Sequence, residues 1–178
     1  MSWKKFVVVG IFAMVVMAGV PAHAGTVGLY GAFWDTDDAD SSWGGGVRMG
    51  FDFLKWMELE FHGTYYPNFG GDVLGSSVDI TALPVDGGLK FKLFPEKPVT
   101  LYVGAGGTYY FMSADGVDIS DETGYYAEAG VEFGAHFHMF FEALWRKMEA
   151  DVDAGPVSGT ASFDGLTGHF GVNWSWGK

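Results

Sequence analysis

Charged side chains recur at every second position of several apolar stretches in this sequence, the spacing with which one face of a β-strand presents its residues. Seven carboxylates and four bases follow this spacing: Asp52, Glu58, Glu60, Asp86, Glu128, Glu132 and Glu142, with Arg48, Lys90, Lys92 and Arg146. If they share one enclosed space, they predict a buried ionic network with an excess of three negative charges. His62 and His169 complete the predicted network. Because like charges would then be neighbours, the network should hold a proton on a carboxyl group or admit water or a cation.

The turns between these stretches predict which residues face each other. A turn at Leu54-Lys55, with Phe53 opposite Met57, gives four facing pairs: Arg48 with His62, Gly50 with Glu60, Gly46 with Thr64 and Gly44 with Tyr66. Glycine would thus lie opposite bulky neighbours. A turn around Phe137 gives two further pairs: Glu128 with Arg146 and Glu132 with Glu142.

Other arrangements that could support catalysis or cofactor binding are weak. A lipid-modifying barrel enzyme needs a serine and a histidine near the lipid-facing rim, and no histidine after residue 24 lies in a long loop: His62, His136, His138 and His169. His62 with Glu60 and Thr64 could imitate an acid–base set, but a hydrogen-bonded interior histidine is the favoured interpretation. His136 and His138 are assigned to a tight turn, and residues 35–40 lack the glycine and distal glutamate of a calcium loop. We therefore predict no enzyme activity, no cofactor and no bound metal.

Composition limits the class of protein. The chain has 178 residues, of which 48% are hydrophobic and 18% charged, so it is not a disordered chain. Its 28 glycines and 17% aromatic residues are typical of a β-barrel. The absence of cysteine excludes disulfides and thiolate metal sites. A formal net charge of −12 argues against a nucleic-acid partner, because phosphate binding requires clustered bases.

Residues 1–24 are predicted to be a secretory signal peptide. Lys4 and Lys5 precede the apolar residues 6–20, and Ala22-His23-Ala24 has the small-x-small form of a cleavage site. The alternative is a membrane anchor, but the apolar stretch is shorter than the roughly 20 residues that a spanning helix needs. We therefore expect residues 25–178 to form the mature, single-domain protein.

Period-2 alternation predicts eight strands in the mature chain: 26–35, 43–53, 57–66, 83–92, 100–110, 127–133, 141–146 and 166–176. The apolar face takes the odd positions, except in the last strand, where it takes the even ones. Alternation alone does not decide which face points outward, since a soluble ligand-binding barrel encloses its apolar face.

The connections and the aromatic residues favour a barrel with its apolar face in lipid. Long acidic connections at 35–40, 67–77, 113–124 and 149–160 alternate with short turns at 54–55, 95–98 and 135–137. Aromatic residues gather near the long connections (Trp34, Trp43, Tyr65, Tyr109, Phe111, Tyr125) and near the short turns (Phe53, Trp56, Phe91, Phe94, Phe133, Phe141, Trp174, Trp176). Two such belts suit two membrane interfaces. We predict an all-β fold, an eight-stranded antiparallel up-and-down transmembrane β-barrel with both termini on the periplasmic side.

Four segments resemble a known family: 83–91 (LPVDGGLKF), 101–107 (LYVGAGG), 140–146 (FFEALWR) and 169–176 (HFGVNWSW). They are similar to the small outer-membrane β-barrel proteins related to the OmpA transmembrane domain, OmpX and the opacity proteins, over essentially all of residues 25–178. His169, Gly171, Trp174 and Trp176 resemble the signal that the barrel-assembly machinery recognises. The resemblance implies a monomer in the Gram-negative outer membrane, in contact with lipid and lipopolysaccharide.

Eight strands leave an interior that side chains just fill. We therefore expect a structural or surface-interaction protein with a filled lumen. The alternative is a narrow, porin-like channel that prefers cations because its lumen carries excess negative charge; a lipid-modifying enzyme ranks below both. The long connections carry most of the remaining acids: Asp35, Asp37, Asp38, Asp40, Asp72, Asp115, Asp118, Asp121, Glu122, Glu149, Asp151 and Asp153. These acids could join lipopolysaccharide phosphates through divalent cations or bind a cationic partner.

Overall fold

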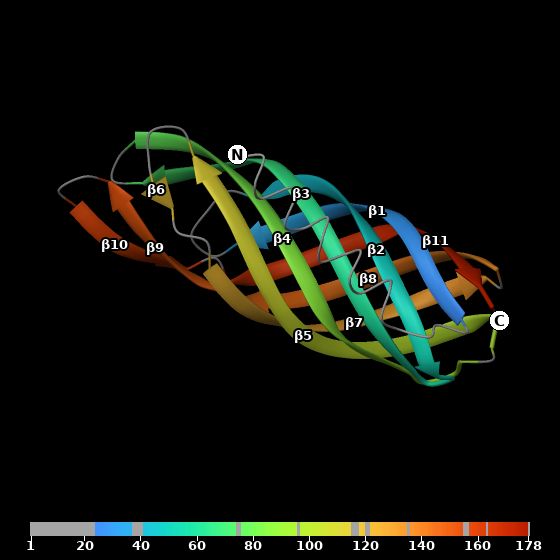
Figure 1. Cartoon of the computed structure of the whole chain (residues 1–178). Coiled ribbons are helices and arrows are strands. Elements are labelled where there is room, and N and C mark those ends of the chain that lie inside the picture. Colours follow the sequence, from blue (N-terminus) through green and yellow to red (C-terminus); the bar gives the residue numbers. More distant parts are fainter. Residues whose placement is uncertain are drawn as a thin grey trace.

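A computed structural model describes residues 24–36, 41–73, 76–95, 97–114, 118–119, 122–134, 136–154, 157–162 and 164–177 (Figure 1). The predicted signal peptide lies outside these residues apart from Ala24, which begins the first strand. Within the described ranges, no helix has the length and hydropathy required to cross a membrane.

Eight long strands close into a barrel in the order β1-β11-β8-β7-β5-β4-β3-β2, and every neighbouring pair is antiparallel. Their bounds are β1 (Ala24–Thr36), β2 (Ser42–Leu54), β3 (Met57–Val73), β4 (Ser76–Lys92), β5 (Val99–Ala114), β7 (Glu122–Gly134), β8 (Phe137–Lys147) and β11 (Gly165–Trp176). The first strand pairs with the last, with Gly25 opposite Trp176, which closes the sheet on itself. The predicted eight-stranded antiparallel barrel is confirmed.

The alternation of side chains follows the predicted faces. Along β8, Phe141 and Trp145 are about half exposed, whereas Glu142 and Arg146 are buried. The predicted change of parity in β11 is also confirmed, because His169 is buried while Trp174 is exposed. The barrel therefore presents an apolar outer surface and encloses its polar side chains, the arrangement that a lipid environment requires.

The two ends of the barrel differ. Short turns join β2 to β3, β4 to β5 and β7 to β8 at the end where the chain terminates (Figure 1). At the opposite end a small sheet is formed by β6 (Asp118–Ile119), β9 (Glu149–Ala154) and β10 (Val157–Ser162), in the order β10-β9-β6. We call these the short-turn end and the long-hairpin end.

Parts of the predicted loops are strands. The β3–β4 ladder continues through the expected loop 67–77 until Val73 pairs with Ser76, and 149–162 forms a hairpin. Both faces of a strand beyond the membrane meet water, so no alternation of polar and apolar residues marks it in the sequence.

The predicted register is confirmed between β2 and β3, where three pairs match: Arg48 with His62, Gly50 with Glu60 and Gly46 with Thr64. At the turn itself the prediction is wrong by one residue, because the register shifts and Leu54, rather than Phe53, pairs with Met57.

The predicted register between β7 and β8 is wrong by two residues. Glu128 lies opposite Leu144, not Arg146, and Glu132 lies opposite Phe140, not Glu142. The turn is centred one residue earlier than predicted, because Gly134 pairs with His138. Gly134 has a φ of 129°, a backbone conformation that glycine adopts readily. A shift of two residues keeps every side chain on its predicted face while changing its partner.

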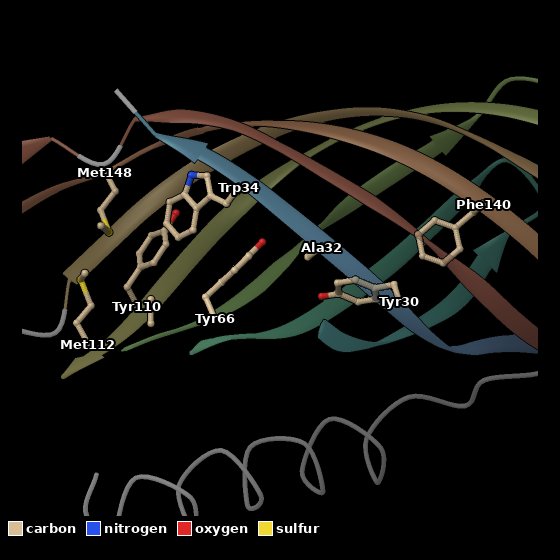
Figure 2. Close-up of a cluster of buried hydrophobic side chains, with 9 residues drawn as sticks. Tyr30, Ala32, Trp34, Tyr66, Tyr110, Met112, Phe140 and Met148 are labelled. Carbon is tan, nitrogen blue, oxygen red and sulfur yellow. The ribbon is translucent and has the colours of Figure 1, made fainter. Parts of the chain in front are cut away.

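Trp34 was expected in the lipid-facing aromatic belt, and this expectation is wrong. Its side chain points into the lumen, where its ring centroid lies 5.3 Å from that of Tyr66 and 5.9 Å from that of Tyr110 (Figure 2). The parity of β1 explains this, because Tyr30 and Ala32 occupy the same inner face. Trp43 and Tyr65 at this end do lie on the outer surface.

Glycines make space for bulky inner side chains, and this predicts the effect of two matched substitutions. A Cβ atom at Gly46 would meet the ring and hydroxyl of Tyr30 and the carbonyl of Gly63, whereas a Cβ at Gly63 would meet no atom within 4 Å. We expect Gly46→Ala to lower the free energy of unfolding by about 1–3 kcal/mol. Both substitutions lower the conformational entropy of the unfolded chain, which by itself favours folding. Gly63→Ala adds no clash, so it should be neutral or mildly stabilising. Urea unfolding of the folded barrel in detergent measures both, and equal midpoints for the two variants would contradict the packing argument.

Candidate functional site

The lumen contains all the charged residues of the predicted network. Twelve of them are buried: Arg48, Glu58, Glu60, His62, Asp86, Lys90, Lys92, Glu128, Glu132, Glu142, Arg146 and His169. Asp52, at the short-turn end of β2, is partly exposed. The alternation of each strand directs these side chains inward, and barrel closure brings together residues that are far apart in the sequence.

Two lysines of β4 organise the carboxylates nearest the short-turn end. Lys92 Nζ lies 2.5 Å from both Asp52 Oδ1 and Glu58 Oε2. Lys90 Nζ lies 2.6 Å from Glu60 Oε2 and 3.5 Å from Glu58 Oε1. The β3–β4 register places Glu58 directly opposite Lys90, so the two strands are joined by side chains as well as by the backbone ladder.

Arg48 connects opposite walls in the middle of the barrel. Its guanidinium lies 3.1 Å from Glu60 Oε2 on β3 and 3.5 Å from Glu142 Oε2 on β8. The Tyr102 hydroxyl donates a hydrogen bond of 2.8 Å to Glu142 Oε2, and His169 Nδ1 lies 3.0 Å from Glu142 Oε1. Glu142 is thereby held by residues from β2, β5 and β11.

Glu132 lies closer to the short-turn end and has weaker contacts. His138 Nδ1 lies 3.6 Å from Glu132 Oε2, and Asn173 Nδ2 donates to Oε1 at 3.3 Å. The assignment of His138 to a tight turn is wrong, because it is the second residue of β8 and points into the lumen. The earlier position of the β7–β8 turn accounts for this. His136 is exposed at that turn, as predicted.

Arg146 forms a separate ion pair toward the long-hairpin end. Its two terminal nitrogens each lie 2.8 Å from an oxygen of Asp86, a bidentate arrangement, and its Nε donates to Thr167 at 3.1 Å. Thr108 donates to Asp86 Oδ1 at 2.7 Å. The expected partner, Glu128, is not the one that Arg146 contacts, because the register places Tyr126 opposite Arg146.

Several buried polar atoms in the middle of the lumen have no hydrogen-bond partner within the described part of the chain. They are both oxygens of Glu128, both ring nitrogens of His62, Glu60 Oε1 and His169 Nε2. Ligand atoms of Glu60, His62, Glu128 and Glu142 lie within 4.8 Å of one another. Unpartnered polar atoms are costly at such depth, so this cluster differs from the satisfied ion pairs around it.

Aromatic and sulfur-containing side chains fill the lumen on the long-hairpin side of the Arg146–Asp86 pair. Trp34, Tyr66, Tyr110, Met112 and Met148 pack together there (Figure 2). Trp34, Tyr66 and Tyr110 are almost fully buried. We call these five residues the aromatic cap.

The uncharged partners of the network are not among the site residues predicted from the sequence. Two cations lie over aromatic rings: Arg48 Cζ is 4.3 Å from the centroid of the Phe140 ring, and Lys90 Nζ is 4.4 Å from the centroid of the Tyr102 ring. Asn173 and Thr167 supply hydrogen bonds. All four lie at inward-facing positions of the alternation on their strands, and that alternation is the signal that could have identified them.

This chain is similar to a known protein family and to several solved structures. A family model described as the outer membrane protein beta-barrel domain matches residues 6–175. No curated protein matches the sequence.

Three solved structures share the fold at low sequence identity. The outer membrane protein OprG from Pseudomonas aeruginosa has a TM-score of 0.76 at 14% identity, with 86% of this chain and 95% of that chain covered. Neisserial surface protein A has a TM-score of 0.58 at 15% identity, covering 87% and 96%. The outer membrane protein AlkL has a TM-score of 0.57 at 14% identity, covering 86% and 90%.

The Arg146–Asp86 pair predicts a large loss of stability when one partner is removed. Arg146→Met leaves Asp86 buried without its base, and we expect the free energy of unfolding to fall by about 3–5 kcal/mol. The double variant Arg146→Met with Asp86→Leu removes both charges and should recover most of this loss.

Lys147→Met supplies the matched control for urea unfolding. Lys147 is 41% exposed and its Nζ lies 3.9 Å from Asp164, so we expect a change below about 1 kcal/mol. If Arg146→Met were no more destabilising than Lys147→Met, the stability of the barrel would not depend on the Arg146–Asp86 pair.

Proposed function

The chain belongs to the outer membrane protein beta-barrel domain family and is an outer-membrane protein, and from this we propose that it has a structural and surface-interaction role. In this proposal the barrel is anchored in lipid, its lumen is blocked by side chains, and its acidic long hairpins face the cell exterior. The observation that supports the proposal is the burial of large charged and aromatic side chains in the lumen, namely those of the ion-pair network and the aromatic cap.

The size of the barrel supports a blocked lumen. An eight-stranded barrel has an interior just wide enough to be filled by side chains. Here the largest fully buried side chains lie at successive heights along the lumen, with Tyr102 and Arg48 in the middle and Arg146 and Trp34 toward the long-hairpin end. Arg48 and Tyr102 meet at Glu142, and Arg146 lies over the Trp34 ring at 5.8 Å. These contacts between different walls support a lumen that side chains block.

The long hairpins supply the surface for interaction. They concentrate the acidic residues of the mature chain outside the lumen, and the register of the small sheet sets Asp118 opposite Asp153. A divalent cation or a cationic partner would offset this concentration of negative charge. We propose lipopolysaccharide phosphates bridged by divalent cations as the partner at this end.

The closing strand supports two further proposals, one about a partner and one about the oligomeric state. β11 closes the barrel against β1, with Trp174 and Trp176 on the outer surface and His169 inside. We propose that His169, Gly171, Trp174 and Trp176 form the signal read by the barrel-assembly machinery during insertion. A closed sheet offers no unpaired edge to a second copy, which supports a monomer.

A cation-preferring channel is the second candidate function. The lumen carries seven carboxylates against four bases, and this excess of negative charge would favour cations over anions. An enzyme has less support: His62 and His169 are enclosed in the lumen, and the hydroxyls of Ser42 and Ser175 contact the Trp43 carbonyl and Thr26 rather than a histidine.

Planar-bilayer recording separates the blocked barrel from the channel. Because large buried side chains extend along the lumen from the lysines of β4 to the aromatic cap, we expect no discrete conductance steps at any holding potential. A porin of known conductance, reconstituted in the same bilayers, controls for insertion. Reproducible steps with cation selectivity would reject the blocked lumen and favour the channel.

The surface role predicts a phenotype for the long hairpins. Replacing Asp115, Asp118, Asp121, Asp151 and Asp153 by alanine should reduce adhesion of intact cells and raise the permeability of the envelope to large antibiotics, because the cation-bridged contacts are lost. Lys97→Ala, at the exposed short-turn end, is the control. Adhesion and permeability that stay at the level of the unmodified protein, with normal amounts of folded barrel, would count against this role.

A further inference from the structure

The unpartnered cluster in the middle of the lumen has the composition of a metal site. Glu60 and His62 are two residues apart on β3, so both point inward, while Glu128 comes from β7 and Glu142 from β8. Each of the four can offer one ligand atom, and these atoms lie within 4.8 Å of one another. All four side chains are at least nine-tenths buried.

Three of the four residues have polar atoms that the surrounding bases do not engage. Lys90 and Arg48 contact Oε2 of Glu60, whereas Oε1 has no hydrogen-bond partner among the described residues. Neither oxygen of Glu128 accepts a hydrogen bond from a base or hydroxyl there, and the group within hydrogen-bonding reach of Glu128 is the carboxyl group of Glu60. His62 forms no hydrogen bond, although its Nε2 lies 3.3 Å from Glu60 Oε2. Two carboxyl groups and an imidazole from β3 and β7 thus lie together without a base between them.

The remaining contacts resemble the support that metal ligands receive. Ligating carboxylates are themselves hydrogen-bonded as a rule, and this fixes their orientation. Glu142 accepts from Tyr102 at 2.8 Å and lies 3.0 Å from His169 Nδ1, and Glu60 is held by Lys90 at 2.6 Å. His169 is therefore a positioning residue, and with its Nε2 unpartnered it lies beside the cluster.

Charge balance favours a cation at this point. The lumen has three more carboxylates than bases, and no described base lies within 4.0 Å of Glu128 to form an ion pair. One divalent ion would reduce the excess from three negative charges to one. We propose that Glu60, His62, Glu128 and Glu142 bind one divalent transition-metal ion.

The donor set indicates the class of metal. Carboxylates and water alone suit Mg²⁺ and Ca²⁺, whereas an imidazole among the ligands suits Zn²⁺ and its neighbours in the first transition row. Ligand atoms around a tetrahedral Zn²⁺, at about 2.0–2.2 Å from the ion, are roughly 3.4 Å apart. The cluster must contract slightly to reach this spacing, which rotations of the glutamate side chains can provide. The site lies in the lumen and does not depend on what the long hairpins bind.

Zinc binding by the full chain tests the proposal. The protein carries no histidine tag, is stripped with a chelator and is refolded with and without Zn²⁺, because the filled lumen can slow entry of the ion. After desalting, we expect one zinc per folded chain by mass spectrometry. His62→Gln and Glu128→Gln should each weaken binding at least about 100-fold, since loss of a ligand's supporting partner alone costs roughly 10–100-fold. His136→Gln, which removes an exposed histidine, should bind as the unmodified protein does.

Two results would overturn the site. The first is folded protein without zinc after refolding in its presence, which would mean that protons or water neutralise the cluster. The second is equal zinc in the unmodified protein and in the double variant His62→Gln with Glu128→Gln, which would assign the zinc to surface acids. If the variants do not fold, X-ray absorption of zinc in the unmodified protein decides: one imidazole ligand supports the site, and coordination by oxygen alone rejects it.

Discussion

The closure of β11 onto β1 is the constraint on which the rest of the structure depends. Hydrocarbon offers no partner to a backbone N–H or C=O group, so a sheet can cross a lipid bilayer only when its first and last strands pair. That pairing fixes an even number of antiparallel strands and brings the start of β1 and the end of β11 to the same end of the barrel. Closure also means that charged side chains at the depth of the membrane must face the lumen.

The lumen is stabilised by contacts that cross it rather than by contacts that follow the strands. Arg48 on β2 reaches Glu142 on β8, and Arg146 on β8 reaches Asp86 on β4. Such buried pairs contribute little over a well-packed apolar core, but each becomes a large penalty when one partner is missing. They therefore specify one strand register more strongly than they add to the total free energy of unfolding, and the glycines opposite Tyr30 and Tyr102 act in the same direction.

Most of the predictions from the sequence rest on the alternation of polar and apolar residues. A period of two residues identifies a strand and its two faces, so the strands and their number followed from the pattern. The inward position of residues such as His169 needed, in addition, the lengths of the connections and the two aromatic belts. The pattern is unchanged by a shift of two residues, so the β7–β8 register, in which Gly134 pairs with His138, was beyond it. The Arg146–Asp86 contact depends on how the strands stagger around the barrel, and the strands of the long hairpins have no lipid-facing side to mark them.

The cross-lumen network has a consequence for the order of folding. Arg48 lies on β2 and Glu142 on β8, strands that are not neighbours in the barrel, so this ion pair forms only when the sheet has curved closed. An open sheet in the bilayer would expose these charges to hydrocarbon, at a cost of several kcal/mol for each ion. This cost favours closure of the sheet at the same time as its insertion. The same barrier opposes the reverse process, so the folded barrel should persist in the membrane through slow unfolding as much as through its equilibrium stability.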